Sequence, residues 1–353
     1  MDCYVNPAVH AYKAFGMRIS SDLRLPELSQ IHAILDHQES DISNQKADIF
    51  IAEGCHVDWP SFKQSPHSTK TLTMAPSEWR LEIEGVGWLR VSGGSSIIWE
   101  RWDDSVSDRD IRTFLITSAL GALLIQRGLM PLNATTLARD GKAIMLLGNP
   151  ASGKSALSWC LMQQGWELLS SELSIVDQNN NVWPGLRHLK LWHDSAIALN
   201  LDWQNLPVVR RGLKRYSLLP PSLPVADQAV PLAIIYAIGP RHDTTKQSAT
   251  LDPEQEELSP SACAIKAFAF PSQRDALLSI RNQVFHPRFY RAMECEAQLF
   301  IQASSLVRSS RGYILRAPEG VARMREALGS VDLLKPETIV IDTRKESESF
   351  EII

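Results

Sequence analysis

Apolar and polar residues alternate over positions 79–102 ("WRLEIEGVGWLRVSGGSSIIWERW"), and this spacing predicts a short antiparallel meander. The alternation stops at "GVG" and at "SGGS", where we expect turns. A further strand is expected at "DIFIAEG" (48–54), whereas the polar, acidic stretch 30–46 is expected to form a loop or a frayed helix. The pattern therefore predicts a mainly β domain over residues 1–105.

The spacing of apolar residues becomes helical after Ser107. The residues that recur at this spacing are Ile111, Phe114, Leu115, Ser118 and Ala122. "SDRD" predicts a capping box, in which the Ser107 hydroxyl accepts the Asp110 N–H and the Asp110 carboxylate accepts the Ser107 N–H. Gly128 is the expected end of the helix. The apolar run 111–125 contains Arg112 and is shorter than the roughly 20 residues that a bilayer span needs, so we expect a buried helix.

Two strand patterns follow the helix, "NATTLARDG" and "KAIMLLG". The Asp140-Gly141 pair between them predicts a hairpin. A helix is expected from Lys154 to about Gln164, then a strand at "WELLSSELSIVD" (166–177), a "QNNN" turn and a second strand at "VWPG". Helices and strands therefore both occur in the second domain, which we expect to cover residues 106–353.

The later part of the chain continues this mixture. "LRHLKLW" and "PLAIIYAIG" predict further core strands, and the polar stretch 243–257 predicts a loop. Helices are expected in "SPSACAIKAFAF" and "FYRAMECEAQLFIQASSLV", and a late strand in "GYILRAP".

One motif in this domain carries recognisable chemistry. "GNPASGKS" matches G-x-x-x-x-G-K-[ST] from Gly148 to Ser155, between an apolar run and a predicted helix, which is the context that the motif requires. Gly148 and Gly153 let successive N–H groups point at phosphate oxygens, and the helix N-terminus adds its partial positive charge. Lys154 reaches the β- and γ-phosphates, and the Ser155 hydroxyl can bind Mg²⁺. The predicted nucleotide-binding residues are Gly148, Asn149, Pro150, Ala151, Ser152, Gly153, Lys154, Ser155 and Ala156.

The order of these features resembles the HPr kinase/phosphorylase superfamily, in particular the shorter HPr-kinase-like serine kinases related to lasso-peptide precursor kinases. The resemblance is carried by "YKAFGMRISSDLRLPEL", by "RGLMPLNATTL" ahead of the loop, by the loop itself and by "QQGWELLSSE" close behind it, and it continues in "WPGLRHLKLW", "LPVVRRGLKRYSLLP" and "PLAIIYAIG". It implies an α/β fold with a P-loop kinase core like that of phosphoenolpyruvate carboxykinase, and an N-terminal, mainly β domain. ATP and Mg²⁺ are the cofactors that it implies.

Two positions depart from this pattern. The resemblance implies an acidic pair, one carboxylate for the incoming hydroxyl and one for the metal. Here Ser171 stands at the first position and Glu172 at the second, and Asn133 stands where the pattern has His. A serine hydroxyl accepts a proton poorly, but phosphoryl transfer depends mainly on positioning and electrostatics, so Lys154, Mg²⁺ and Glu172 could sustain a slower reaction. The catalytic candidates are therefore Glu172, Ser171, Asn133 and Lys154, and the metal candidates are Ser155 and Glu172.

Two basic clusters follow the acidic position. In "RRGLKRY", the residues Arg211, Lys214 and Arg215 either clamp a phosphate or an acidic acceptor peptide, or lie on a solvated loop. One of Arg187, His188 and Lys190 could face the nucleotide. The glycine-rich signature of true HPr kinases is replaced by "LKLWHDSAIALN", so we expect neither the phosphorolytic reaction nor HPr as the substrate.

Composition limits the classes of partner. The chain has 353 residues, a formal net charge of -4 and 22% charged residues, which gives no reason to expect nucleic-acid or membrane binding. The five cysteines form no C-x-x-C pair, and no signal peptide is evident at the N-terminus, so a cytoplasmic protein with reduced thiols is expected. Whether several copies assemble stays open.

Three functions follow from these observations. The first is an ATP- and Mg²⁺-dependent kinase that phosphorylates a hydroxyl, most simply a Ser of a peptide or small protein such as a ribosomal peptide precursor. The second is a catalytically degraded nucleotide-binding module that regulates or scaffolds a partner. The third is a small-molecule kinase on the same scaffold.

Overall fold

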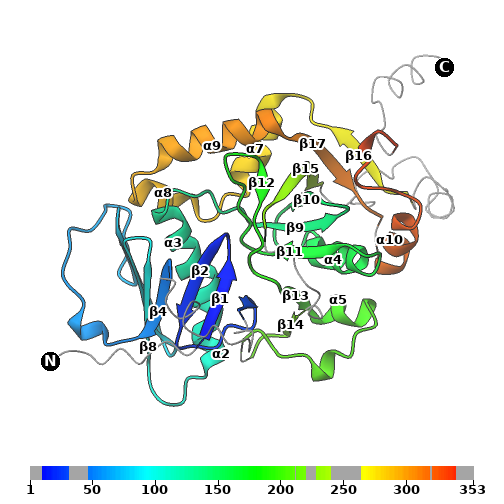
Figure 1. Ribbon diagram of the computed structural model, residues 1–353. Coiled ribbons are helices and arrows are strands. Elements are labelled where there is room, and N and C mark those ends of the chain that lie inside the picture. The colour runs from blue at the N-terminus through cyan, green and yellow to red at the C-terminus, as the bar shows by residue number, and fades with distance from the viewer. Residues whose placement is uncertain are drawn as a thin grey trace, which may run out of the picture.

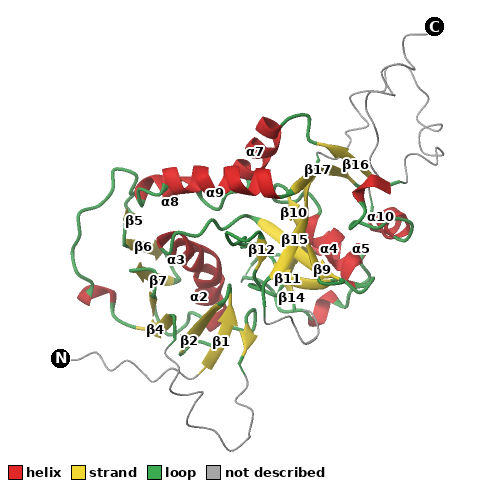
Figure 2. Cartoon of the chain, turned by 45° about the horizontal axis from the view of Figure 1, so that its top comes forward, coloured by secondary structure: helices red, strands yellow, loops and turns green. Residues whose placement is uncertain are grey.

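A computed structural model describes residues 10–31, 47–210, 212–219, 228–239, 264–318 and 320–338. Two large sheets form its two halves, with the N-terminal sheet on the left of Figure 1 and the sheet that carries the glycine-rich loop on the right. The helices α8 (Pro287–Ala292) and α9 (Glu296–Ser309) run along the top of the N-terminal half toward the second sheet in both views (Figure 1, Figure 2). The mixed α/β class expected from the sequence is confirmed.

The first sheet has eight strands in the order β3-β1-β2-β4-β8-β7-β6-β5. Their bounds are β1 (His10–Ala14), β2 (Met17–Ser21), β3 (Ser29–Gln30), β4 (Ile49–Glu53), β5 (Leu72–Ala75), β6 (Glu78–Ile83), β7 (Gly87–Ser92) and β8 (Ser96–Arg101). The meander predicted over 79–102 is confirmed as β6, β7 and β8, which pair antiparallel. The strand predicted at 48–54 is β4, which pairs parallel with both β2 and β8, so the sheet is mixed.

The helix after the first sheet begins where the sequence predicts. It consists of α2 (Asp108–Phe114), a π-helical turn (Leu115–Ala119) and α3 (Leu120–Gln126), and Gly128 ends it with a φ of 75°. The Ser107 hydroxyl accepts the Asp110 N–H at 3.4 Å, as expected, and donates to the Asp110 carboxylate at 2.7 Å. Among the described residues, no helix is long and apolar enough to cross a membrane.

The second sheet has seven strands, and six of them follow the order β11-β9-β10-β15-β17-β16. Their bounds are β9 (Ala134–Arg139), β10 (Lys142–Leu147), β11 (Glu167–Ser170), β12 (Asn181–Val182), β15 (Val230–Ile238), β16 (Lys266–Ala269) and β17 (Arg311–Arg316). The strands β10, β15 and β17 are parallel. The predicted hairpin joins β9 to β10, with positive φ angles at Asp140 and Gly141, which match a type I′ turn. The helices α4 (Lys154–Met162) and α10 (Val321–Leu328) pack together beside this sheet.

A smaller unit lies below the second sheet in Figure 1. It consists of β13 (Leu189–Trp192), β14 (Arg215–Leu218) and α5 (His193–Ala198), followed by a 3₁₀ turn (Trp203–Asn205). The strands β13 and β14 pair only with each other, antiparallel, and we call them the ribbon. The core strand predicted in "LRHLKLW" is confirmed as β13, whose Leu189 and Leu191 are buried in the apolar core, although it does not join the large sheet. Its strand pairs with the basic segment 215–218 instead.

Two other expectations are corrected. The strand predicted over 166–177 ends at Ser170, because Glu172 has a φ of 64°, which a strand cannot contain. The helix predicted in "SPSACAIKAFAF" is wrong where that segment is described, since Lys266–Ala269 pairs with β17 as the edge strand β16.

The last predicted helix is divided into α8 and α9, and α7 (Gln273–Asn282) precedes them. The loop predicted over 243–257 and most of the stretch 30–46 lie outside the described residues.

One apolar core joins the first sheet to the second. It includes Trp79 and Val91 of the first sheet, Leu123 of α3, Phe289 of α8, and Leu147 at the end of β10. A second cluster fills the space between α4, α10 and the other face of the second sheet. The shared core places the first sheet close to the glycine-rich loop, although a division at residue 105 stays a prediction.

Replacing Trp79 by Ala should lower the free energy of unfolding by about 3–5 kcal/mol, because it leaves a cavity between the two halves. The Trp79 side chain is fully buried, and its ring centroid lies 5.9 Å from that of Phe289. Urea unfolding followed by far-UV circular dichroism measures the effect. Trp102→Ala is the matched control, since that side chain is 39% exposed. An equal loss in both variants would contradict a shared core at Trp79.

Candidate functional site

The glycine-rich loop connects the carboxyl end of β10 to the first turn of α4. Gly153 has a φ of 95° and Ala151 a φ of 65°, so the loop uses left-handed backbone at two positions. A Cβ at Gly148 would lie 2.6 Å from the Ser152 Oγ, which leaves no room for a side chain there. These features form a tight turn whose backbone can approach a phosphate closely.

Lys154 lies inside this turn. Its Nζ donates hydrogen bonds to the carbonyl oxygens of Gly148 and, at 3.1 Å, of Asn149. Burial lowers the pKa of the Lys154 ammonium to about 8, the charge of Glu172 opposes this shift, and that of Arg215 adds to it. Lys154, Glu172 and Arg215 are therefore close enough for their charges to act on one another.

The remaining predicted loop residues form one continuous surface. Asn149, Pro150 and Ala151 are exposed, while Ser155 and Ala156 are half-buried on the first turn of α4. Within the described part of the chain, the buried Ser152 Oγ has no hydrogen-bond partner. The N–H groups of the first turn of α4 are hydrogen-bond donors of the kind that a phosphate accepts.

Glu172 lies at the centre of a cluster of basic side chains. Its Oε2 accepts a hydrogen bond from Lys190 Nζ at 2.6 Å and lies 3.4 Å from His188 Nε2, and its Oε1 lies 3.9 Å from Arg215 Nη2. Burial alone raises the pKa of the Glu172 carboxyl, but contact with His188 and the charge of Lys190 outweigh it and hold the pKa well below its ordinary value. Glu172 is therefore an ionised carboxylate at neutral pH.

The left-handed backbone at Glu172 is part of this arrangement. A non-glycine residue with a φ of 64° costs about 1–2 kcal/mol, and such strain persists where surrounding contacts fix it. The turn directs the carboxylate toward β13, which carries Lys190, instead of continuing β11. The contact with Lys190 offsets the backbone cost.

Ser171 and Asn133 occupy different environments. Ser171 is 3% exposed, and its hydroxyl donates to the His188 carbonyl oxygen, so it ties the strand end to the ribbon. Asn133 is exposed, its N–H donates to the Gln283 carbonyl oxygen at 2.6 Å, and the Gln283 amide donates to Asn149 of the loop at 3.1 Å. Gln283 was missed by sequence reasoning, since it lies far along the chain at the end of α7.

The basic cluster "RRGLKRY" contributes one side chain to the site. Arg215 reaches Glu172 and stacks on Trp192, at 5.3 Å from the ring centroid. Lys214 is exposed and makes no ion pair with any residue that the structure describes, and Arg211 lies outside those residues. His188 and Lys190, considered for the nucleotide, contact Glu172 instead.

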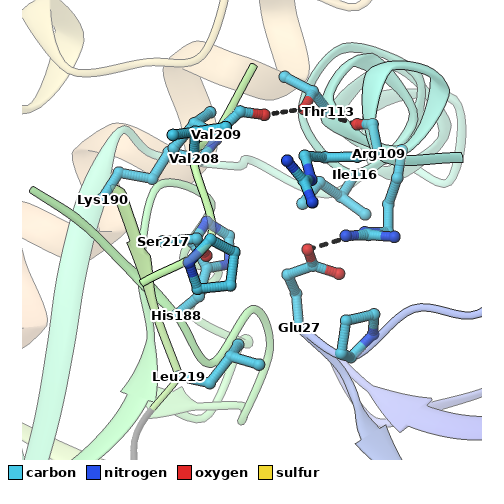
Figure 3. A pocket seen from close by; sticks show the side chains of 13 residues that line it. Glu27, Arg109, Thr113, Ile116, His188, Lys190, Val208, Val209, Ser217 and Leu219 are labelled. Carbon is cyan, nitrogen blue, oxygen red and sulfur yellow. Dashed lines mark hydrogen bonds and ion pairs between the residues drawn. The ribbon is translucent and has the colours of Figure 1, made fainter. Parts of the chain in front are cut away.

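A pocket of about 60 Å³ opens beside Glu172, between the first sheet, α2 and the ribbon (Figure 3). Its lining comprises Pro26, Glu27, Arg109, Arg112, Thr113, Ile116, His188, Lys190, Pro207, Val208, Val209, Ser217 and Leu219. Glu27 Oε1 accepts a hydrogen bond from Arg112 Nε at 2.9 Å, which joins the loop before β3 to α2. No sequence signal pointed to Glu27, Arg109 or Arg112, because their segments meet only in the folded chain.

Two oxygen donors suit a metal ion. Mg²⁺ in phosphoryl-transfer sites takes one or two protein ligands together with phosphate oxygens and water. Ser155 stands at the start of α4, and the Glu172 oxygen that is not bonded to Lys190 could be the second donor. Among the described residues, no group of three or more His, Cys, Asp or Glu side chains could hold a metal alone.

Compared with known proteins, the chain matches no family model and no curated sequence. The relation to HPr-kinase-like proteins therefore stays a resemblance in the order of motifs. Any case for a function depends on the groups that the fold brings together around the loop and Glu172.

Replacing Glu172 by Gln should lower the free energy of unfolding at neutral pH by about 3 kcal/mol, because it leaves the buried Lys190 ammonium without a counter-charge. The pKa of Glu172 is depressed in the folded state, so its stabilisation is complete above the unfolded value of about 4.3 and is lost as the pH falls through the folded value. The difference between wild type and variant should therefore shrink in acid, as urea unfolding at several pH values would measure.

Glu296→Gln is the control for this prediction. Glu296 pairs with Arg291 at 3.1 Å, but both side chains are more than half exposed, and such pairs contribute little. If both variants lose the same small amount, or if the Glu172 effect does not change with pH, the ion pair does not stabilise the fold as described.

Proposed function

We propose that the chain is an ATP- and Mg²⁺-dependent kinase that phosphorylates a serine hydroxyl of a peptide or small protein. The observation that supports this most is that Glu172 and Arg215 lie 3.9 Å apart and near enough to Lys154 of the glycine-rich loop for their charges to act on its pKa. A phosphate-binding cation, an ionised carboxylate and an arginine are the groups that phosphoryl transfer needs.

Each group has a role that follows from its chemistry. The loop N–H groups and Lys154 bind the phosphates, and Mg²⁺ held by Ser155 and Glu172 supplies neutralisation of phosphate charge. Glu172 orients the serine hydroxyl and takes its proton, while Arg215 stabilises negative charge on the transferred group. The serine oxygen forms a bond to the γ-phosphorus, the bond from that phosphorus to the bridging oxygen breaks, and ADP leaves.

The lowered pKa of Glu172 makes it a weak base. This suits a loose transition state, in which the hydroxyl needs orientation more than early deprotonation. Lys190 and His188 hold the carboxylate from the ribbon side, so they act as positioning residues for Glu172.

A second function is favoured by one observation. The Ser171 hydroxyl is bonded to the His188 carbonyl, and the Glu172 carboxylate is bonded to Lys190, so both groups at the acidic position already have partners. A site of this kind could bind nucleotide without transferring phosphate, and nucleotide would then regulate contact with a partner protein.

Incubation with γ-labelled ATP, Mg²⁺ and serine-containing peptides separates the two functions. We expect transfer in the wild type and a loss of at least about a hundredfold in Lys154→Ala and Glu172→Gln, since each removes a charge that acts on the transferred group. Lys142→Ala is the control, because Lys142 is exposed at the opposite end of β10. Tight ATP binding with no turnover in any form of the protein would exclude the kinase.

The pH dependence of nucleotide binding tests the role of Lys154. Its pKa of about 8 means that the phosphate-binding ammonium is present below that pH and is lost above it. ATP affinity should therefore be constant up to about pH 8 and fall by up to about tenfold per unit above it. Calorimetric titration measures this, and Lys154→Arg, which stays charged, should remove the dependence. An unchanged pH profile in Lys154→Arg would show that another group titrates.

A further inference from the structure

Two residues that hold Glu172 line the pocket between α2, the first sheet and the ribbon. His188 and Lys190, which lie 3.4 and 2.6 Å from the Glu172 Oε2, both line its wall. A group that enters the pocket from the surface therefore approaches Glu172 through the two residues that hold it. We therefore expect the phosphate acceptor, rather than the nucleotide, to enter by this pocket.

Three buried polar atoms of the pocket-lining residues have no hydrogen-bond partner among the described residues. They are both ring nitrogens of His188, whose ring is fully buried, and the Oε2 of Glu27, which is 7% exposed. The His188 Nε2 lies 3.4 Å from Glu172, so the Nδ1 and the Glu27 Oε2 are the two without a charged neighbour of this kind. Figure 3 shows the two side chains on opposite walls, with Glu27 bound to Arg112 through its other oxygen. Buried polar groups without a partner are costly, so both atoms suit a ligand that brings a donor and a second polar group.

The rest of the lining limits the size and the polarity of that ligand. The walls are largely apolar and consist of Pro26, Ile116, Pro207, Val208, Val209 and Leu219. The volume of about 60 Å³ has room for one small side chain and few further atoms. A serine side chain and the peptide bond next to it have suitable dimensions. Peptide N–H groups can donate to Glu27 Oε2, and the serine hydroxyl can bond to His188 beside Glu172.

Charge at the mouth of the pocket indicates the flanking residues of the acceptor. Glu27 and Glu172 already have Arg112 and Lys190 as partners. Arg109 lines the pocket, is exposed on α2 and makes no ion pair within the described ranges. Among the described residues that line the pocket, positive charge therefore exceeds negative charge.

We propose that this pocket binds the phosphate acceptor as an acidic peptide. The acceptor serine enters between Glu27 and His188, and an Asp or Glu residue beside it pairs with Arg109. The inference rests on the proposed function in one respect, since it takes the occupant of the pocket to be the phosphate acceptor. Carboxylates suit guanidinium groups through paired, charge-assisted hydrogen bonds.

Fluorescence anisotropy with labelled peptides, without nucleotide, tests the binding. The peptides share one central Ser and differ in their flanking residues, which are Asp, Asn or Lys. We expect the Asp peptide to bind about tenfold more tightly than the Asn peptide at low salt, with a difference that shrinks as salt screens the charges. The Lys peptide should bind most weakly.

Three variants locate the site. Arg109→Glu should remove the preference for Asp over Asn, and Val208→Trp should fill the pocket and weaken both peptides. Arg308→Glu on α9 is the control, because Arg308 is exposed on a different helix and outside the pocket lining, so the preference should persist. Far-UV circular dichroism and ATP affinity, which should match the wild type, establish that each variant is folded.

The outcomes separate this inference from the proposed function. Equal binding of the Asp and Asn peptides, or a preference that survives both Arg109→Glu and Val208→Trp, would overturn the acidic-peptide site. Transfer to serine peptides regardless of flanking charge would keep the kinase and overturn the inference. Binding of acidic peptides that depends on Arg109 without transfer of labelled phosphate would leave the site and overturn the kinase.

Discussion

The carboxylate of Glu172 joins two parts of the molecule that the sheets do not connect. The ribbon of β13 and β14 shares no strand pairing with either large sheet, so other contacts must fix its position. The Lys190–Glu172 hydrogen bond is one of them, and the bond from the Ser171 hydroxyl to the His188 carbonyl lies directly beside it. The strained turn at Glu172 is one point at which the second sheet holds the ribbon, and the packing of Leu189 and Leu191 in the apolar core is another.

The same contact decides where the pocket lies. Once Glu172 holds β13, the ribbon faces α2 across a gap that Thr113 closes on one side by donating to the Val209 carbonyl at 2.9 Å. Glu27 closes the other side, where its carbonyl accepts the Arg187 N–H at 2.8 Å. The first sheet therefore contributes to the site through a loop, and its shared core with β10 keeps that loop in place.

Features that depend on neighbouring residues could be predicted from the sequence. The loop from Gly148 to Ser155, the Asp140-Gly141 hairpin and the Ser107 cap each arise from local backbone chemistry, and each lies where expected. The surroundings of Glu172 could not be predicted, because Lys190 and Arg215 reach it only after the chain has left the second sheet and returned. Lys266–Ala269 was assigned to a helix for a similar reason: its four residues give little periodicity, and pairing with β17 decides their conformation.

The contacts around Glu172 give a physical reason for Ser171 at the position where the resembling kinases have the first acid of an acidic pair. An acid at position 171 would meet the His188 carbonyl oxygen, where the serine hydroxyl donates, so the serine fits the contact that fixes the ribbon. Glu172 then carries both the structural contact with Lys190 and the chemistry expected of a carboxylate. Glu172 must keep its partner Lys190 to maintain the fold. To bind a metal or orient a hydroxyl, it would have to give up part of that contact, and this would make phosphate transfer slower. In the proposed kinase, the balance between Lys190 and the reacting groups for this one carboxylate would therefore decide between transfer of phosphate and binding of nucleotide without transfer.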